Sequence, residues 1–462
     1  MTDILFLSAA ELAEHYRQRA LSPVEVLDAT LARAEAIQPA LNAFCLFDAD
    51  RAREAARASE HRWSAGTPLS PLDGVPIPIK DNQAVRGQPG ASGSLALDLV
   101  PPEADAPHVA RLREAGAIFY ARTTMPDCAW KAVTDSPRTG VTRNPWDPAL
   151  TPGGSSGGAA VAVATGCGPI ATGSDGGGSI RIPAAFTGIY GIKPTTGRVP
   201  GIGEAPDISA TGPLARTVAD AALALSVMCR PDRSDPIASA LTVPDFVAEA
   251  GRGVKGLRVA VSATCGFAHT DPSRLGPLAA AARALEDAGA IVEQADPPAW
   301  NIRRSYLTVV EAAFGGVVAS MPGVRVALLD PGLFETARRG MMTSAAAARA
   351  AEIDRIRLTR VFIAFFNQYD LLLTPCVPIA PFQAGVNVNT PDATLYPEWY
   401  DWTPYTWVFN ATKLPAASCP AGLDAGGLPQ AVQLAATHFR EDLILRASAV
   451  LEAAMPYPRP PG

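Results

Sequence analysis

Residues 151–183 read TPGGSSGGAAVAVATGCGPIATGSDGGGSIRIP, in which an apolar segment separates two blocks rich in glycine and serine. Residues 153–198 hold 13 of the 39 glycines of the chain, and three of these immediately precede Ser179. Because glycine adopts backbone conformations that other residues avoid, consecutive glycines let several N–H groups point at one anion. If Ser179 is a nucleophile, the oxyanion of a tetrahedral intermediate would bind there. The predicted donors are the backbone amides of Gly176, Gly177, Gly178 and Ser179.

Other interpretations of this stretch are a tight turn, a phosphate-binding loop and the serine of an α/β-hydrolase. A phosphate loop needs a G-K-[ST] ending or a G-x-G-x-x-G opening, and the stretch has neither. Residues 154–158 match the G-x-S-x-G nucleophile elbow, but the prolines just before them disfavour the buried strand that an elbow follows. No histidine lies between His108 and His269, and His438 is the only plausible late base. A histidine-dependent triad is therefore disfavoured.

A residue that could activate a serine without histidine is Lys80, in D-G-V-P-I-P-I-K-D-N (73–82). The 39 basic residues include only five lysines, and this one ends an apolar segment interrupted by prolines. A neutral lysine is a competent base, although its usual pKa of about 10.4 would have to fall by about three units in a dry pocket. The alternative is an ordinary lysine at a strand end, exposed or paired with Asp73 or Asp81.

These blocks together resemble the amidase signature enzymes. The similarity lies in G-V-P-I-P-I-K-D-N, T-P-G-G-S-S-G-G, G-S-D-G-G-G-S-I-R-I-P and Y-G-I-K-P-T-T-G-R-V-P, which occur in the order of that family. The spacings of 75 residues from Lys80 to Ser155 and 24 from Ser155 to Ser179 are also similar. The resemblance extends over nearly the whole chain. It departs from the family at Thr187, where a cysteine is common, and in A-V-Q-L-A-A-T-H (431–438), which lacks the usual glycine.

The resemblance implies a Ser-Ser-Lys triad, in which Ser179 is the nucleophile, Ser155 a bridging serine with a cis peptide bond, and Lys80 the base. It implies hydrolysis of a linear carboxylic acid amide through an acyl-enzyme, with a small-molecule amide as substrate and no cofactor or metal. Candidate substrate neighbours are Ala129 and Trp130. Further residues are expected to support the loop by structural hydrogen bonds: Ser156, Asp175 and Arg181.

The rest of the chain predicts an α/β fold, one large domain (1–462) with a mixed β-sheet covered on both faces by helices. We expect an N-terminal helical region (1–65), a signature core (66–230), the remainder of the core and pocket (231–455) and a tail (456–462). Capping boxes at Ser8 and Ser22 begin predicted helices, and candidate insertions lie at residues 230–255 and 296–343. Further helices are predicted at 48–62, 107–115, 272–289, 344–367 and 441–454, and strands at 41–47, 117–122, 256–263, 290–295, 369–375 and 430–436.

Composition limits the classes of function. The net charge of −6 does not favour a nucleic-acid partner, and no apolar run approaches the roughly 18 residues that a membrane span needs. The N-terminus lacks the basic region of a secretory signal. Seven scattered cysteines without a C-x-x-C pair, and five scattered histidines, disfavour disulfides and metal sites. We therefore expect a cytoplasmic enzyme without membrane association, for which a homodimer is one open assembly state.

Three questions stay open from the sequence. Seven aromatic residues between 396 and 409 form either core, a subunit contact or a wall of the substrate site. The chain could also be the glutaminase subunit of a tRNA-dependent amidotransferase, or a catalytically silent scaffold of the same fold. The acyl group and the leaving amine cannot be read from these motifs.

Overall fold

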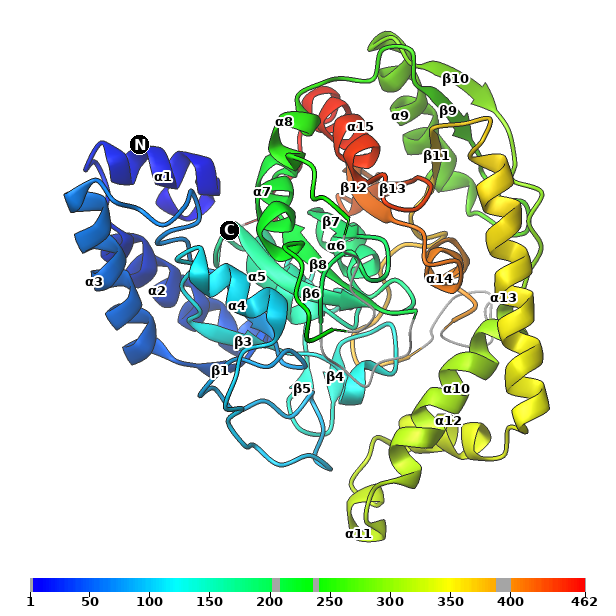
Figure 1. Ribbon diagram of the computed structural model, residues 1–462, viewed down its shortest axis with the longest axis horizontal. Coiled ribbons are helices and arrows are strands. Elements are labelled where there is room, and N and C mark those ends of the chain that lie inside the picture. Colours follow the sequence, from blue (N-terminus) through cyan, green and yellow to red (C-terminus); the bar gives the residue numbers. More distant parts are fainter. Residues whose placement is uncertain (1–2, 202–207, 236–240, 388–399, 462) are drawn as a thin grey trace.

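The computed structural model describes residues 3–201, 208–235, 241–387 and 400–461. Its centre is an eight-stranded sheet in the order β10-β9-β11-β13-β12-β7-β8-β6 (Figure 1). Neighbouring strands are parallel from β10 to β11 and antiparallel from there to β6, so the sheet is mixed as predicted. The strands are β6 (Ile170–Asp175), β7 (Tyr190–Lys193), β8 (Ala210–Ala215), β9 (Arg258–Val261), β10 (Ile291–Gln294), β11 (Leu371–Pro375), β12 (Ala416–Leu423) and β13 (Pro429–Ala435).

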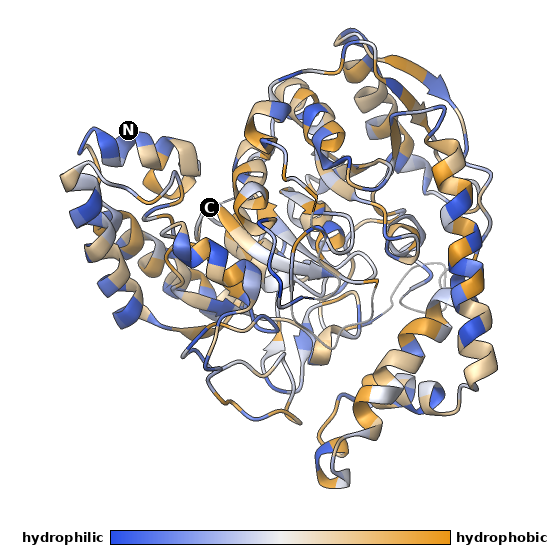
Figure 2. Ribbon diagram, viewed as in Figure 1, coloured by the Kyte–Doolittle hydropathy of each residue, from blue (hydrophilic) through white to orange (hydrophobic). Residues whose placement is uncertain are grey.

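Helices cover both faces of this sheet, as expected (Figure 1). Side chains of β11 alternate between the two faces: Leu371 and Leu373 join one core cluster, and Leu372 joins another. The first cluster includes α7 (Val218–Met228), α9 (Leu275–Asp287) and α15 (Glu441–Ala454). The second includes α10 (Arg303–Ala319), α13 (Ala345–Phe365) and α14 (Pro404–Ala411). On α13, hydrophilic and hydrophobic residues alternate along the helix (Figure 2), which fits a helix with one face on the core.

A smaller sheet carries the predicted base. Its order is β1-β3-β2, from β1 (Phe44–Phe47), β3 (Ala121–Thr123) and β2 (Ile79–Lys80). β2 also contacts β6 of the large sheet, which places Lys80 beside the glycine-rich block. A separate two-stranded sheet pairs β4 (Asp135–Ser136) with β5 (Gly140–Val141).

The N-terminal helices form as their capping boxes predict. Ser8 and Ser22 each accept a hydrogen bond from the backbone N–H three residues later, and the side chains of Glu11 and Glu25 accept one from the N–H of the cap residue in return. The helices are α1 (Ala9–Arg17), α2 (Pro23–Leu41) and α3 (Ala49–Ala65). Further helices are α4 (Pro107–Glu114), α5 (Gly157–Ala164), α6 (Arg181–Thr187) and α8 (Phe246–Ala250), and short 3-10 turns lie at Ile4–Phe6, Asp127–Ala129 and Pro272–Arg274.

The candidate insertion 296–343 is largely helical. It contains α10, α11 (Gly323–Val326) and α12 (Pro331–Met341), which lie together beside α13 (Figure 1). The glycines of this segment made its helices difficult to predict from the sequence, but two of the glycines have a packing role. Gly315 of α10 and Gly340 of α12 lie where the helices cross, and a Cβ on either would meet the backbone of the other helix.

The aromatic segment contributes to the core. Trp402 stacks on Phe186 with ring centroids 5.9 Å apart, and Trp407 stacks on Tyr306 at 5.3 Å. Residues 396–399 lie outside the described part of the chain. No helix of the described residues is both long and apolar enough to span a membrane.

Candidate active site

The site lies where β2, β6 and two loops meet. Lys80 ends β2, Ser155 lies just before α5, and Ser179 lies between β6 and α6. The Gly154–Ser155 peptide bond is cis, as the resemblance implied. The backbone N–H of Ser156 donates to the carbonyl oxygen of Ser179 at 3.1 Å, which ties the two serine blocks together. The three residues predicted to form the triad are thus adjacent.

Lys80 is completely buried and is surrounded by serine hydroxyls. Its Nζ lies 2.8 Å from Ser155 Oγ, 2.8 Å from Ser156 Oγ and 3.0 Å from Ser174 Oγ. Burial lowers the pKa of Lys80 to about 7, and the negative charge of Asp175 opposes this only in part. The neutral amine required of a base is therefore accessible near neutral pH.

The hydrogen-bond pattern orients this amine. Ser156 Oγ donates to the carbonyl oxygen of Ser174 at 3.3 Å, and Ser174 Oγ accepts from Asn82 Nδ2 at 3.0 Å. With these bonds made, both hydroxyl oxygens can accept a hydrogen bond from Lys80. A neutral amine has two N–H groups and one lone pair. If the N–H groups point at Ser156 and Ser174, the lone pair faces the hydroxyl of Ser155.

Ser174→Ala tests this orientation. We expect kcat/KM to fall about tenfold to 100-fold, because the amine loses one of its two anchors. The acidic limb of the pH–rate profile should also move to lower pH, since the lost hydroxyl stabilises the ammonium form and its removal lowers the pKa of Lys80. Ser174→Thr, which keeps the hydroxyl, is the control and should restore both values. An unchanged profile and rate in Ser174→Ala would show that Ser174 does not orient Lys80.

The predicted oxyanion site needs one correction. The backbone N–H of Gly178 donates to Asp175 Oδ1 at 2.7 Å and is therefore not available to an oxyanion. The amides of Gly176, Gly177 and Ser179 have no hydrogen-bond partner within the described residues, and all three residues are partly exposed at the cavity. In the sequence the three consecutive glycines are equivalent, so Gly178 was included among the donors. Only the folded structure shows that the Asp175 carboxylate binds its N–H.

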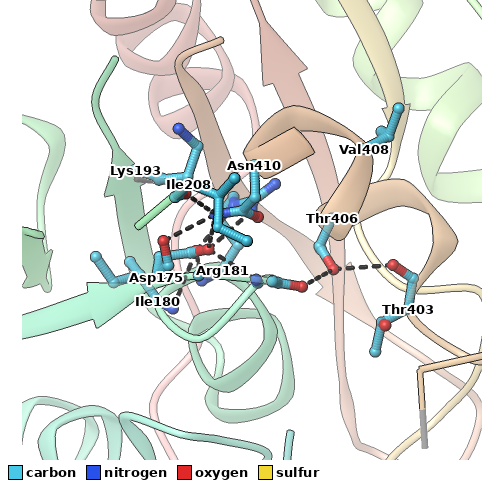
Figure 3. Close-up of polar contacts among 12 residues, drawn as sticks. Asp175, Ile180, Arg181, Lys193, Ile208, Thr403, Thr406, Val408 and Asn410 are labelled. Atoms are coloured by element: carbon cyan, nitrogen blue, oxygen red, sulfur yellow. Dashed lines mark hydrogen bonds and ion pairs between the residues drawn. The ribbon is translucent and has the colours of Figure 1, made fainter. Parts of the chain in front are cut away.

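Two hydroxyls hold the carbonyl groups of this loop. Tyr306 of α10 donates to the carbonyl oxygen of Gly176 at 3.0 Å. Thr406 Oγ1 of α14, which is labelled in Figure 3, donates to the carbonyl oxygen of Gly177 at 2.7 Å. The Gly176 carbonyl shares a peptide plane with the N–H of Gly177, which points the opposite way. Fixing the carbonyl on Tyr306 therefore fixes the N–H on the other side of the loop.

A buried ion pair between Asp175 and Arg181 supports the loop of residues 176–179. Arg181 donates to Asp175 at 3.0 and 2.9 Å and to Asn410 Oδ1 at 2.7 Å (Figure 3). It also donates to Gln433 Oε1 at 2.7 Å. Although burial opposes ionisation of Asp175, the charge and hydrogen bonds of Arg181 hold the pKa of that carboxyl well below its usual value. Neither residue lines the cavity, which agrees with a supporting role.

Sequence reasoning missed several of these partners. Ser174 and Asn82 lie in the same sequence blocks as Ser179 and Lys80, G-S-D-G-G-G-S and P-I-K-D-N. Their closeness in sequence to these two residues could have indicated that they belong to the site. Tyr306, Thr406 and Gln433 reach the site from 127 to 254 residues beyond Ser179, which no local pattern connects to it.

Above Ser179 lies a cavity of about 380 Å³. The predicted substrate neighbours Ala129 and Trp130 both line it, together with Ser155 and Ser179. His108 also lines it, but its Nδ1 contacts the Pro200 carbonyl oxygen and burial lowers its pKa to about 4. His438 does not line the cavity within the described part of the chain, and its Nε2 lies 3.0 Å from the Thr412 carbonyl oxygen. No cluster of three or more candidate metal ligands occurs among the described residues.

Comparison with known proteins gives the family. A family model described as Amidase matches residues 25–445. The chain belongs to the amidase signature family. It is similar to an acylamidase of Rhodococcus erythropolis, with 35% identity over 98% of this chain and 96% of the relative. It is also similar to the A-type subunit of the glutamyl-tRNA(Gln) amidotransferase of Carboxydothermus hydrogenoformans, with 33% identity over 97% of each chain.

Solved structures of amidase signature enzymes show the same fold. A bacterial aryl acylamidase superposes with a TM-score of 0.90 at 30% identity, covering 98% of this chain and 96% of that one. The 6-aminohexanoate cyclic dimer hydrolase, in complex with substrate, has a TM-score of 0.89 at 28% identity over 99% of both chains. The predictions of family and fold class are therefore confirmed.

The two departures from the amidase signature pattern leave the site intact. Thr187 is buried in α6 and donates to the Pro183 carbonyl oxygen at 2.7 Å. The segment 431–438 supplies most of β13, including Gln433, which accepts a hydrogen bond from Arg181.

Proposed function

We propose that this amidase signature enzyme is a stand-alone amidase that hydrolyses linear carboxylic acid amides through an acyl-enzyme on Ser179. The observation that carries the proposal is the 2.8 Å contact between Lys80 Nζ and Ser155 Oγ in a buried site where the pKa of Lys80 falls to about 7. A lysine with that pKa is neutral in a large fraction of molecules at neutral pH. It can therefore accept a proton through Ser155 when Ser179 attacks.

In the acylation step, Ser179 Oγ forms a bond to the carbonyl carbon of the amide. Its proton passes to Ser155 Oγ, whose own proton passes to Lys80 Nζ. The carbonyl oxygen becomes an oxyanion beside the free amides of the loop, each worth about 3 kcal/mol if well aligned. When the C–N bond breaks, the relay returns the proton to the nitrogen, since an amide anion is too basic to leave. The products are an ester of Ser179 and a free amine or ammonia.

Water then takes the place of the amine. Its proton passes through Ser155 to Lys80 while its oxygen attacks the ester carbon, and the proton returns to Ser179 Oγ as the ester bond breaks. One amide and one water are consumed, and one carboxylic acid and one amine are formed. The triad and the loop amides end each cycle in their starting state.

A glutaminase role is the second candidate, because A-type subunits of glutamyl-tRNA(Gln) amidotransferases are among the similar proteins. Free glutamine carries an ammonium and a carboxylate, so its site must supply compensating charges. The lysine at this cavity, Lys131, is only 5% exposed, and its Nζ already pairs with Asp135 at 2.9 Å and Asp330 at 3.3 Å. No arginine lines the cavity in the described part of the chain. Asp235 is the acidic residue of the described lining, and its Oδ2 accepts a hydrogen bond from the Gly201 N–H at 2.8 Å. The described lining therefore offers no unpaired cation to the carboxylate of glutamine, which favours an uncharged acyl group.

The purified chain alone tests the proposal. We expect it to release amine from acyl anilides and simple linear amides without ATP or a second protein, with kcat/KM at least about 100-fold higher than for L-glutamine. Cyclic amides should be included because of the structural neighbour. Glutamine as the best substrate, or activity that appears only with a partner protein, would favour the amidotransferase role.

A further inference from the structure

One face of α10 forms a continuous apolar wall of the cavity. The lining residues recur every three or four positions, which is the spacing of one helix face. They are Tyr306, Val310, Ala313, Phe314, Val317 and Val318. From the first to the last, this face spans about 18 Å at 1.5 Å per residue. Such a wall is much longer than a small acyl group, for example acetyl, can cover.

The wall begins at the reacting centre. Tyr306 touches the oxyanion loop through its bond to the Gly176 carbonyl oxygen, so the first turn of α10 lies beside Ser179. At the far end, Val318 joins a buried cluster with Trp130, Leu329 and Leu333, all of which also line the cavity. The apolar surface therefore runs from the nucleophile to an end closed by α12 and the 128–132 loop.

The far end of this channel is fixed by close packing. Trp130 lies against Gly332 at the start of α12, where a Cβ would overlap the indole ring. Gly315 and Gly340 let α10 and α12 cross at close range. The lysine next to this wall, Lys131, is neutralised by its two aspartates. An occupant of the channel therefore meets apolar surface and no uncompensated charge from the described lining residues of these elements.

A second part of the cavity is polar and lies on the side of the proton relay. It includes Asn82, which is bonded to Ser174 beside Lys80, and continues past Gln83 and Thr196. The departing amine and the incoming water must exchange protons with the same relay, so both use this side. Water is favoured among polar side chains and disfavoured in the apolar channel. The acyl group therefore occupies the part of the cavity that α10 lines.

We propose that α10 binds the acyl chain, and that the preferred substrates are amides of extended, uncharged aliphatic or arylaliphatic carboxylic acids with a small polar amine as leaving group. This rests on the proposed amidase function and specifies its substrate class. Burial of each further methylene along α10 should raise kcat/KM about fourfold until the channel is full.

A series of primary amides, all of which release ammonia, with acyl chains from acetyl through hexanoyl to decanoyl tests this on the wild-type enzyme. We expect decanoyl to exceed acetyl in kcat/KM by at least about 100-fold. Ala313→Trp places an indole in the channel and should reduce the decanoyl-to-acetyl ratio by at least about 30-fold. Ala319→Trp makes the same change at an exposed position of α10 outside the cavity lining and should leave the ratio unchanged.

The outcomes separate the two proposals. Hydrolysis of all the primary amides with no gain from chain length would overturn the acyl-channel assignment and leave the amidase function standing. A gain from longer amines, at constant acyl group, would reverse the assignment of the two sides. Failure to hydrolyse any member, by enzyme whose Ser179 is labelled by a fluorophosphonate, would overturn the amidase function itself and the substrate class with it.

Discussion

Replacing Ser179 with alanine is expected to abolish turnover of every amide, with a loss in kcat of about 10⁵-fold or more. The acyl-enzyme forms on this oxygen, and the neighbouring hydroxyls cannot replace it. Ser155 and Ser156 are fully buried and both engaged with Lys80, whereas Ser179 is partly exposed at the cavity. Fluorophosphonate labelling and detection of the acyl-enzyme by intact mass spectrometry measure the effect directly.

The matched control for Ser179→Ala is Ser226→Ala. Ser226 lies in α7, and its hydroxyl donates within the helix to the Ala222 carbonyl oxygen. This variant should label and turn over like the wild type. Retained acyl-enzyme formation in Ser179→Ala would identify another nucleophile. An unlabelled and inactive wild-type chain would instead support the catalytically silent scaffold.

The second large effect is expected for Lys80→Met, with a fall in kcat/KM of about 10³-fold to 10⁴-fold. The wild-type rate should decline as the pH falls below about 7, because the pKa of Lys80 is lowered to about 7 by burial and the protonated amine cannot act as a base. In Lys80→Met this acidic limb should disappear from the residual activity. Lys80→Arg should be inactive at all accessible pH values, since the pKa of arginine exceeds about 12.

A second buried lysine makes the pH profile more informative. Burial also lowers the pKa of Lys193 to about 7, but its Nζ donates to the Pro194 carbonyl oxygen at 2.9 Å, and no bond to the catalytic serines is formed. If the acidic limb survives in Lys80→Met, another group such as Lys193 is its source and the neutral-lysine mechanism fails. Lys255→Met, at an exposed position, is the matched control and should retain wild-type rate and profile.

Much of the fold could be predicted because its signals are local. The capping boxes at Ser8 and Ser22 fix helix starts within four residues, and short apolar runs mark buried strands such as β11 and β13. The helices of 303–341 were less visible. Their glycines lower helix propensity, and only the crossing of α10 and α12 shows that Gly315 and Gly340 serve close packing.

For the candidate site, too, some features could be predicted from the sequence and others only from the folded structure. The sequence by itself determined which groups could react: a lysine, two serines and a glycine-rich loop in family order, with histidine absent from the motif region. The tertiary structure decided their chemical state, because burial lowers the pKa of Lys80 and Ser174 and Ser156 orient it. It also decided that Asp175 uses the Gly178 amide, and that α10 forms an apolar wall. These properties arise from contacts between residues far apart in the chain, and no local pattern encodes them.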